Sequence, residues 1–265
     1  MYSWGEMRDF FLTELKDWGR DCAVAGMFLT RLPFPLVKNA GLKGRLALSM
    51  RTFPLIGALV GTIAGSVLMM MSAVGLHPLA ASFMGLATGI LITGALHEDG
   101  FADFADGLGG GNTAEKKLKI MRDSRIGVYG VLAIVVSVGI RAAILGGITD
   151  PGIAVALFIT AASFSRGLLP VSMFMLSPAR KSGLAERAGS PDQEGWLKAL
   201  LLGALIGFLL LGPLGGLLSF IAGAIAASLV SWLCHKQIGG YTGDTLGAVQ
   251  QVSEISILIV VVGTL

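Results

Sequence analysis

Seven long apolar stretches constrain this chain more than any other feature of its sequence. A helix rises about 1.5 Å per residue, so about 20 apolar residues cross the hydrocarbon core of a bilayer. Only 14% of the residues are charged, where a soluble domain has roughly a quarter. Backbone groups in lipid must pair within their own segment, which favours helices. We therefore expect an all-α, polytopic membrane bundle with about seven spans, at residues 53–74, 79–96, 126–148, 153–176, 196–211, 214–234 and 246–265.

Two of these spans are less regular than the others. The fifth is short and meets the sixth at Gly212-Pro213, and the seventh contains Gln250, Gln251 and Glu254. Polar side chains inside hydrocarbon are costly unless they find partners. The number of spans could therefore differ from seven by one or two.

The N-terminal segment differs from the rest of the chain. Residues 1–20 alternate charged and aromatic side chains, a pattern typical of an amphipathic helix lying on a membrane. Residues 22–36 are apolar but are interrupted by Arg31, Pro33 and Pro35, which indicates an interfacial or re-entrant segment. We expect residues 1–52 to form the interfacial part of a single membrane-embedded catalytic domain, residues 1–265.

The basic residues predict the orientation, because Lys and Arg gather in cytoplasmic loops. Eight of the 20 basic residues lie in residues 1–52, five in 97–125, four in 177–198 and one in 235–245, whereas the short connections on the opposite side, around residues 75–78, 149–152 and 212–213, hold none. We expect these segments and the N-terminus to be cytoplasmic, in an inner membrane. With seven spans, the C-terminus lies outside.

Two arginines fall inside predicted spans. Arg141 lies near the outer end of its helix, from which its side chain can extend to the interface. Arg166 lies near the middle of the membrane, where an unpaired guanidinium is costly. We expect Arg166 to bind a substrate phosphate; a structural ion pair is the alternative.

The densest acidic segment follows the second span. If that helix continues, Asp99, Asp103 and Asp106 are spaced i, i+4 and i+7 and share one face close to the helix C-terminus. Like charges at this spacing repel each other, and the helix dipole disfavours them there. A hard cation such as Mg²⁺ or Mn²⁺ would offset both effects, which predicts a metal site. A solvated polar helix end is the alternative.

Further candidates lie on the same predicted side. Asp123 precedes the third span and is a candidate fourth ligand or general base, with Arg125 as a phosphate contact. The glycine-rich loop 239–247 offers oxygen ligands from Thr242 and Asp244, although it could be an ordinary polar loop. His97 adjoins the aspartates as a base, a phosphate donor or an orienting group. Carboxylates that face one compartment suit metal-assisted phosphoryl transfer.

Several motifs together resemble the cobalamin (5′-phosphate) synthase family. They occur in the expected order over most of the chain. They are Thr30-Arg31-Leu32-Pro33, Phe53-Pro54-Leu55-Ile56-Gly57, the H-x-D-G-x-A-D-x-x-D-G string from His97 to Gly107, Ile120-Met121-Arg122-Asp123-Ser124-Arg125-Ile126-Gly127, Ser165-Arg166, and Gly239-Gly240-Tyr241-Thr242-Gly243-Asp244-Thr245-Leu246-Gly247-Ala248.

The resemblance implies transfer of the adenosylcobinamide-phosphate moiety of adenosylcobinamide-GDP to α-ribazole or its 5′-phosphate, with release of GMP and with Mg²⁺ as cofactor. It makes the three aspartates of the string the metal ligands, and Asp123 and Asp244 further ligands or the base for the ribazole hydroxyl. It also implies that Arg31, Arg125 and Arg166 contact phosphates. Glu98 departs from the apolar residue associated with its position, so it is left out of the ligand set.

Two other functions are weighed against this one. A CDP-alcohol phosphotransferase of lipid synthesis also carries a D-x-x-D-G core, but its expected A-R pair is replaced here by Gly110-Gly111. A cation-coupled transporter requires acidic residues deep in the membrane, where the predicted spans hold essentially Glu254. The net charge of +3 does not indicate nucleic-acid binding. A homo-oligomer is compatible with the sequence, which does not determine the oligomeric state.

Overall fold

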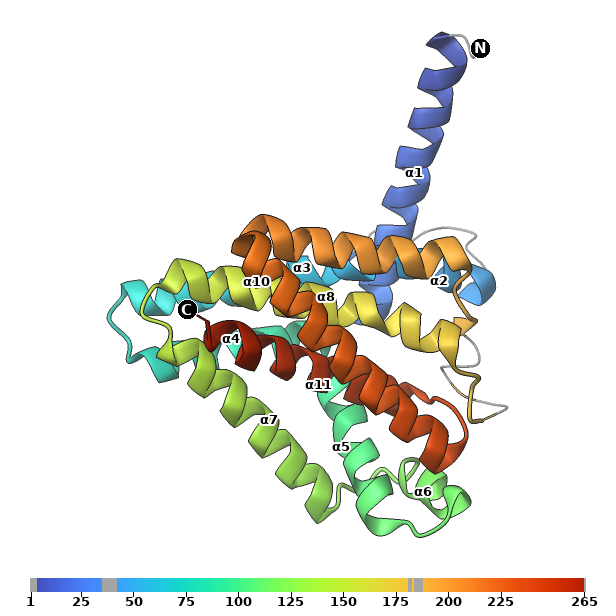
Figure 1. The fold of residues 1–265 in the computed structure, drawn as a ribbon, viewed down its shortest axis with the longest axis vertical. Helices are drawn as coiled ribbons and strands as arrows, with labels where there is room; N and C mark the ends of the chain where they lie inside the picture. Colours follow the sequence, from blue (N-terminus) through green and yellow to red (C-terminus); the bar gives the residue numbers. More distant parts are fainter. Residues whose placement is uncertain (1–3, 35–41, 181–182, 184–187, 265) are drawn as a thin grey trace.

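The computed structural model describes all residues except 1–3, 35–41, 181–182, 184–187 and 265, and it is built of helices (Figure 1). Within the described residues it contains no strand, only an isolated β-bridge between Pro178 and Tyr241. The predicted all-α membrane bundle is therefore confirmed. The helices are α1 (Trp4–Leu29), α2 (Leu42–Ser49), the 3₁₀ turn η1 (Met50–Thr52), α3 (Phe53–Ala73), α4 (Pro78–Thr93), α5 (Leu96–Gly110), α6 (Ala114–Ile120), α7 (Val128–Gly147), α8 (Pro151–Met175), α10 (Gln193–Ile238) and α11 (Gly243–Val262).

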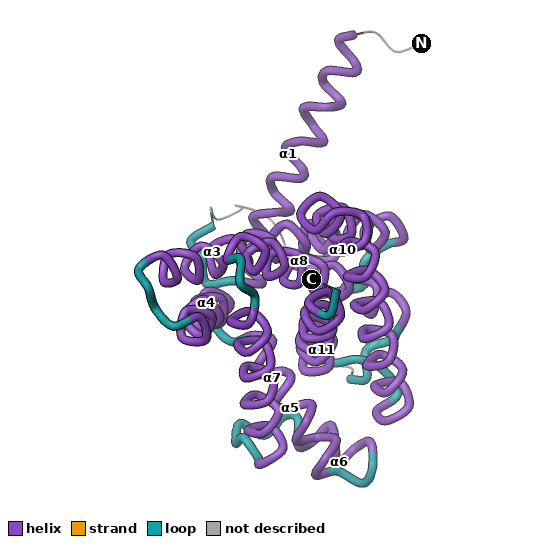
Figure 2. Tube along the Cα trace, turned by 60° about the vertical axis from the view of Figure 1, so that its left-hand side comes forward, coloured by secondary structure: helices purple, strands orange, loops and turns teal. Residues whose placement is uncertain are grey.

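Helix α8 forms the centre of the bundle, between α3 and α10 (Figure 2). Its neighbours approach closely because glycines face it. A Cβ atom at Gly57 or Gly61 of α3 would collide with the α8 backbone, and one at Gly203 of α10 would press on Phe164. Small residues allow this contact in membranes, where packing takes the place of a hydrophobic driving force between helices.

The predicted second span does not continue into the acidic segment. It ends at Gly94, and both Gly94 and Ala95 have left-handed backbone, with φ of 65° and 59°. Helix α5 then starts in a new direction, at 90° to α4. The expectation that the aspartates sit near a helix C-terminus is therefore wrong for Asp99, whereas Asp106 lies four residues before Gly110, the last residue of α5. Asp99 lies in the first turn of α5, where the helix dipole favours a negative charge.

Helix α10 contains the predicted fifth and sixth spans. Gly212 has φ 70° and ψ −177°, and Pro213 follows it, so the helix bends sharply there and folds back on itself (Figure 1). Across the part of the chain that the structure describes, five helices are long and apolar enough to cross a membrane, or six if the bent pair α4–α5 counts as one span. Helix α10 counts once in that number, and a count of seven is not confirmed.

The ends of the helices separate into two groups. The α3–α4 turn, the α7–α8 turn, the bend of α10 and the C-terminus lie on the left of Figure 1, away from the connection between α8 and α10 and the one between α10 and α11. Helix α1 projects from the body across the general direction of α3 and α8 (Figure 1). It exposes Trp4, Phe11 and Leu15. Residues 35 and 36 of the predicted re-entrant stretch lie outside the described residues.

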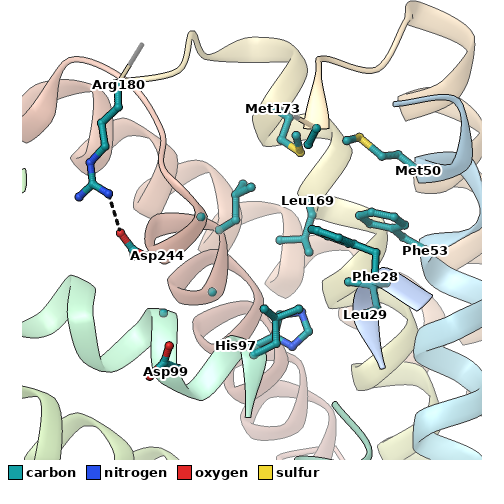
Figure 3. Close-up of a pocket in the computed structure, with 16 residues that line it drawn as sticks. Phe28, Leu29, Met50, Phe53, His97, Asp99, Leu169, Met173, Arg180 and Asp244 are labelled. Carbon is teal, nitrogen blue, oxygen red and sulfur yellow. Dashed lines mark ion pairs between the residues drawn. The ribbon is translucent and has the colours of Figure 1, made fainter. Parts of the chain in front are cut away.

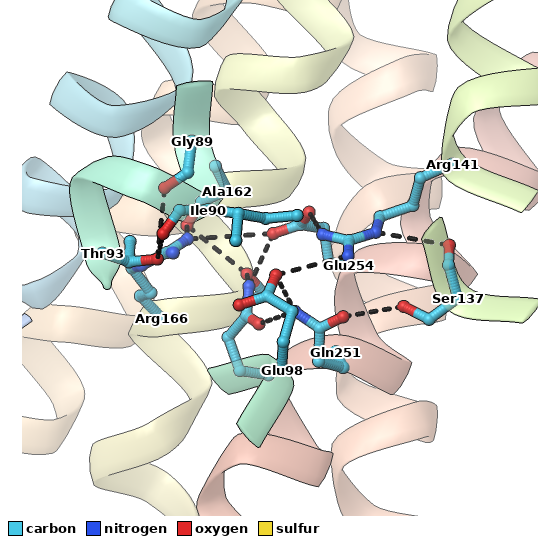
Figure 4. Close-up of polar contacts among 12 residues, drawn as sticks. Gly89, Ile90, Thr93, Glu98, Ser137, Arg141, Ala162, Arg166, Gln251 and Glu254 are labelled. Carbon is cyan, nitrogen blue, oxygen red and sulfur yellow. Dashed lines mark hydrogen bonds and ion pairs between the residues drawn. The ribbon is translucent and has the colours of Figure 1, made fainter. Parts of the chain in front are cut away.

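A buried polar network joins four helices in the interior of the bundle (Figure 4). Arg141 of α7 lies 2.9 Å from Glu254 of α11 and 3.3 Å from Glu98 of α5. Gln251 donates to Glu98 over 3.0 Å and accepts from Ser137 over 2.7 Å. The expectation that Arg141 extends to the membrane surface is wrong, because two carboxylates draw it inward and leave it 3% exposed.

Candidate functional site

Helices α5 and α11 cross at two glycines. A Cβ atom at Gly100 would lie 3.1 Å from the Cα atom of Asp244, and one at Gly247 would lie 2.8 Å from the carbonyl oxygen of His97. Only glycines allow the two backbones to approach this closely. The crossing brings the start of α5 beside the start of α11, and with them Asp99 and Asp244, which are 145 positions apart in sequence.

Three carboxylates therefore share one region. Asp103 lies close enough to Asp99 and Asp244 for both to interact with it electrostatically. Asp99 is exposed, Asp103 is half-buried, and Asp244 is partly buried at the first turn of α11. Asp99 and Asp103 belong to the predicted stripe, and Asp244 to the predicted loop. The structure therefore brings these two sequence motifs together.

Arg180 forms an ion pair with Asp244 in this region, and no sequence motif predicted this role for it. One of its Nη atoms lies 3.5 Å from the Asp244 carboxylate, and the other donates to the Leu118 carbonyl oxygen over 2.9 Å. The bridge between Pro178 and Tyr241 places it there, through hydrogen bonds from Tyr241 N to Ser177 O and from Ala179 N to Tyr241 O. Arg180 is one of four basic residues in residues 177–198, a segment predicted to be cytoplasmic, and no local pattern marks it.

Thr242 caps α11 and orients Asp244. Its hydroxyl oxygen accepts from the Thr245 backbone N–H, and the Thr245 hydroxyl accepts from the Thr242 N–H. The Thr242 hydroxyl also lies 3.1 Å from Asp244 Oδ2, to which it donates. Such a capping box satisfies helix N–H groups that would otherwise lack partners. Thr242 is 3% exposed.

Asp106 lies on the same helix as Asp99 and Asp103, but its oxygens are already engaged. Oδ2 accepts from Gly127 N over 2.7 Å and Oδ1 from Gly130 N over 2.9 Å. Both donors belong to the start of α7, whose N-cap residue is Gly127 and has no side chain to cap the helix. Asp106 thus supplies the cap from another helix, and it connects α5 to α7.

Asp123 and Arg125 form a local pair on the loop before α7. The Arg125 guanidinium donates to both oxygens of Asp123, over 3.0 and 2.7 Å. These hydrogen bonds, with one from the Arg125 backbone N–H, lower the pKa of Asp123 to about 2. The Arg125 side chain is 87% exposed. The structure leaves both residues at the surface, and Asp106 joins this loop to α5 through Gly127.

The two remaining predicted arginines lie at different depths. Arg31 is exposed; its backbone N–H donates to Ile92 O, and its side chain packs against Gly94 at the break between α4 and α5. Arg166 is buried in the polar network, with Nη1 donating to Ala162 O over 2.8 Å and lying 3.8 Å from Glu254. The partner that the structure provides for Arg166 is thus a carboxylate, as in the structural alternative raised from the sequence.

A cavity of about 240 Å³ opens beside the carboxylates (Figure 3). Asp99, Asp244 and Arg180 line one side, and Phe28, Leu29, Met50, Phe53, Leu169 and Met173 line the other. His97 lies between them and is 3% exposed, and neither of its ring nitrogens has a hydrogen-bond partner. Leaving such a group unpaired costs about 1–3 kcal/mol, so His97 is suited to a bound molecule.

The donor set of the site suits a divalent cation that shares its coordination with a substrate. Among the described residues, no three His, Cys, Asp or Glu side chains are arranged to hold a metal ion on their own. A Mg²⁺ site does not require three protein ligands, because Mg²⁺ is commonly bound by one or two carboxylates together with waters and substrate phosphates. Asp99 and Asp103, one helical turn apart and repelling each other, offer such a pair.

The chain is similar to known proteins over most of its length. Residues 21–262 match the family described as cobalamin-5-phosphate synthase. A protein named adenosylcobinamide-GDP ribazoletransferase from Rhizobium etli (strain CIAT 652) is 41% identical over 252 residues, covering 92% of this chain and 97% of its own. Proteins of the same name from Bradyrhizobium diazoefficiens and Mesorhizobium japonicum are 43% and 42% identical, each covering 91% of this chain and 92% of its own. No solved structure shows significant similarity to the chain.

Proposed function

The chain belongs to the cobalamin-5-phosphate synthase family, and from this premise we propose that it transfers the adenosylcobinamide-phosphate group of adenosylcobinamide-GDP to α-ribazole or its 5′-phosphate. The main structural support for placing the reaction at this site is the crossing of α5 and α11 at Gly100 and Gly247. It gathers Asp99, Asp244 and Arg180 at one side of a cavity large enough for a small acceptor.

The reaction requires one bond to form and one to break. A hydroxyl oxygen of the ribazole bonds to the phosphorus that carries the cobinamide. The bond from that phosphorus to the oxygen shared with GMP breaks, and GMP leaves with the electron pair. The hydroxyl proton passes to a carboxylate. Catalysis of this kind depends mainly on positioning and on neutralising charge at the transferring oxygens.

The proposal includes Mg²⁺, with Mn²⁺ as a substitute. Asp99 and Asp103 would bind the metal ion, with Asp244 beside them. The ion would neutralise part of the pyrophosphate charge. Asp106 has a different role in this proposal, because both of its oxygens already accept backbone hydrogen bonds. It maintains the connection between α5 and α7 on which the other two aspartates depend.

The candidates for the general base differ in suitability. A base works best when its pKa lies near the pH at which the enzyme acts. The Arg125 hydrogen bonds hold the pKa of Asp123 at about 2, far below that range. Asp244 is better placed, since it lines the cavity and the Thr242 hydroxyl orients it. We therefore propose Asp244 as the base and Arg125, Arg31 and Arg180 as groups that meet phosphate oxygens.

We further propose that the site faces the cytoplasm. Its residues lie at the starts of α5 and α11 and in the α8–α10 connection, which belong to the segments that hold most of the Lys and Arg residues. Basic residues of this kind are retained on the cytoplasmic side. The nucleotide-activated donor is charged and would be met on that side.

Release of GMP tests the proposal. Purified protein in lipid nanodiscs, given Mg²⁺, adenosylcobinamide-GDP and α-ribazole, is expected to release GMP, and chelation of the metal is expected to stop it. Asp103→Asn should lower the rate by about a hundredfold or more while the protein still inserts and elutes as a folded species. Release of CMP from a CDP-alcohol, with no GMP from the corrinoid donor, would overturn the proposal in favour of lipid synthesis.

A further inference from the structure

The two sides of the cavity at the start of α5 have different chemistry, and Figure 3 shows them apart, with the His97 ring between them. The acidic side holds Asp99 and Asp244 and ends at Arg180. The apolar side holds two phenylalanines, two methionines and two leucines from four other segments of the chain. A molecule that fills both sides must have one charged or reacting end and one apolar end.

The apolar side contains aromatic and thioether side chains, which can pack against a flat ring. The Phe28 and Phe53 rings are stacked with their centroids 6.0 Å apart, and both line the cavity. Met50 and Met173 add thioether sulfurs, which make favourable contacts with aromatic rings. These walls come from α1, η1, α3 and α8, and most of their side chains are buried in the core of the protein.

His97 lies at the border of the two sides and offers unpaired hydrogen-bonding atoms there, and the Nε atom of Arg180, at the acidic end of the cavity, is also buried without a partner among the described residues. Both nitrogens of the His97 ring are buried without a partner. A neutral imidazole presents one donor and one acceptor. A ligand placed against the apolar walls can therefore form a directional hydrogen bond with His97, either as acceptor or as donor.

We propose that this cavity binds the aromatic base of the ribazole acceptor, with the His97 imidazole hydrogen-bonded to it and the ribose directed toward Asp244. This inference rests on the proposed function. It adds that the acceptor, and not the donor, occupies the cavity, and that the base of the acceptor lies against the apolar walls. A ribazole consists of an apolar, bicyclic benzimidazole base on a ribose, so its two ends match the two sides.

Neither half of the donor matches the cavity as well. A corrin ring with its amide side chains is several times larger than about 240 Å³. Guanine is flat and small enough, but its edge carries several polar groups, and the phenylalanine, methionine and leucine walls would leave them unpaired. The donor is therefore left to the open, charged side of the site, where its pyrophosphate meets the carboxylates through the metal.

The test measures binding without turnover. Wild-type protein in nanodiscs is dialysed against α-ribazole alone, with 5,6-dimethylbenzimidazole and GMP as separate competitors. We expect the free base to displace α-ribazole and GMP to leave it bound. Displacement by GMP and not by the base would overturn the inference, as would a wild-type protein that does not bind α-ribazole.

Two variants and their matched controls locate the site. His97→Phe keeps a planar ring and removes both nitrogens, and Met173→Phe narrows the cavity. Each should raise the dissociation constant and the KM for α-ribazole by about tenfold or more, with the KM for the donor unchanged. The controls are His235→Phe and Met175→Phe, whose native side chains are exposed, and they should stay within about twofold of wild type.

Stability separates a binding role from a structural one. Because His97 has no partner within the described protein, His97→Phe should melt at the wild-type temperature or above it. A lower melting temperature together with unchanged α-ribazole binding would overturn the inference. Binding of 5,6-dimethylbenzimidazole without any release of GMP would count against the proposed function alone. GMP release with α-ribazole affinity unaffected by both cavity variants would count against this inference alone.

Discussion

Single carboxylates in this protein have similar sequence surroundings and different uses. Asp103 and Asp106 are three positions apart on α5, and the spacing predicts that they share a face. Asp103 remains half-buried beside Asp99 and Asp244, whereas Asp106 turns to the start of α7 and accepts two backbone hydrogen bonds. The difference arises because Gly127 begins α7 without a capping side chain of its own.

Replacing Asp106 by Asn is expected to destabilise the protein, because an amide offers only one oxygen to two backbone donors. The loss should be about 1–2 kcal/mol in the free energy of unfolding. Denaturant unfolding in detergent measures it. Asp150→Asn is the matched control, since Asp150 caps α8 with one oxygen, on Gly152 N, and an amide oxygen can replace that bond. Equal losses in the two variants would contradict this role for Asp106.

At the scale of the helices, the position of α5 depends on its two ends. The left-handed residues Gly94 and Ala95 turn it away from α4. Glu98, in its first turn, connects it to Arg141 of α7 and Gln251 of α11. Asp99 follows Glu98 directly, so the buried network holds the helix turn that presents the carboxylate to the cavity. The network thus gives Glu98 a structural role at a position where the resemblance implied an apolar residue.

Arg141→Met is expected to cost about 3–5 kcal/mol in the free energy of unfolding, because it removes the ion-pair partner of the buried Glu98 and leaves Glu254 with only the more distant Arg166, at 3.8 Å, as its cation among the described residues. Lys198→Met is the control: Lys198 pairs with Glu194 on the surface, where such a pair contributes about 0.5 kcal/mol or less. Adding Glu254→Gln to Arg141→Met should recover part of the loss. If the two single variants lose the same amount, the network does not stabilise the bundle.

At the scale of the whole molecule, the alternation of the helices separates two surfaces. The short turns, the bend of α10 and the C-terminus lie together, and the connections that hold the site lie away from them (Figure 1). Helix α1 runs across the other helices and exposes apolar side chains at Trp4, Phe11 and Leu15. Such a helix suits the plane of the membrane surface, as the alternation of charges and aromatics predicts.

A reporter fused after α11 is expected to lie outside the cytoplasm, because the bend of α10 at Gly212 fits the two spans, residues 196–211 and 214–234, of the seven-span topology predicted from the sequence. Alkaline phosphatase at that position should be active and green fluorescent protein should not fluoresce. The opposite pattern is expected for reporters inserted after Ser190, in the α8–α10 connection. A fluorescent reporter after α11 would mean an even number of spans and would contradict this topology.

The sequence determined the features that depend on neighbouring residues and on the solvent around them. Runs of about 20 apolar residues have to be helices in lipid, so α3, α7, α8 and α11 follow from the sequence, as do the segments in which the candidate carboxylates lie. The tertiary structure decided which of those residues meet. The pairing of Arg180 with Asp244, the inward turn of Arg141 and the engagement of Asp106 each depend on a partner far away in the chain. No local pattern encodes such a contact. Glycines set how closely two helices pack, and that packing decides which charged side chains on separate helices meet.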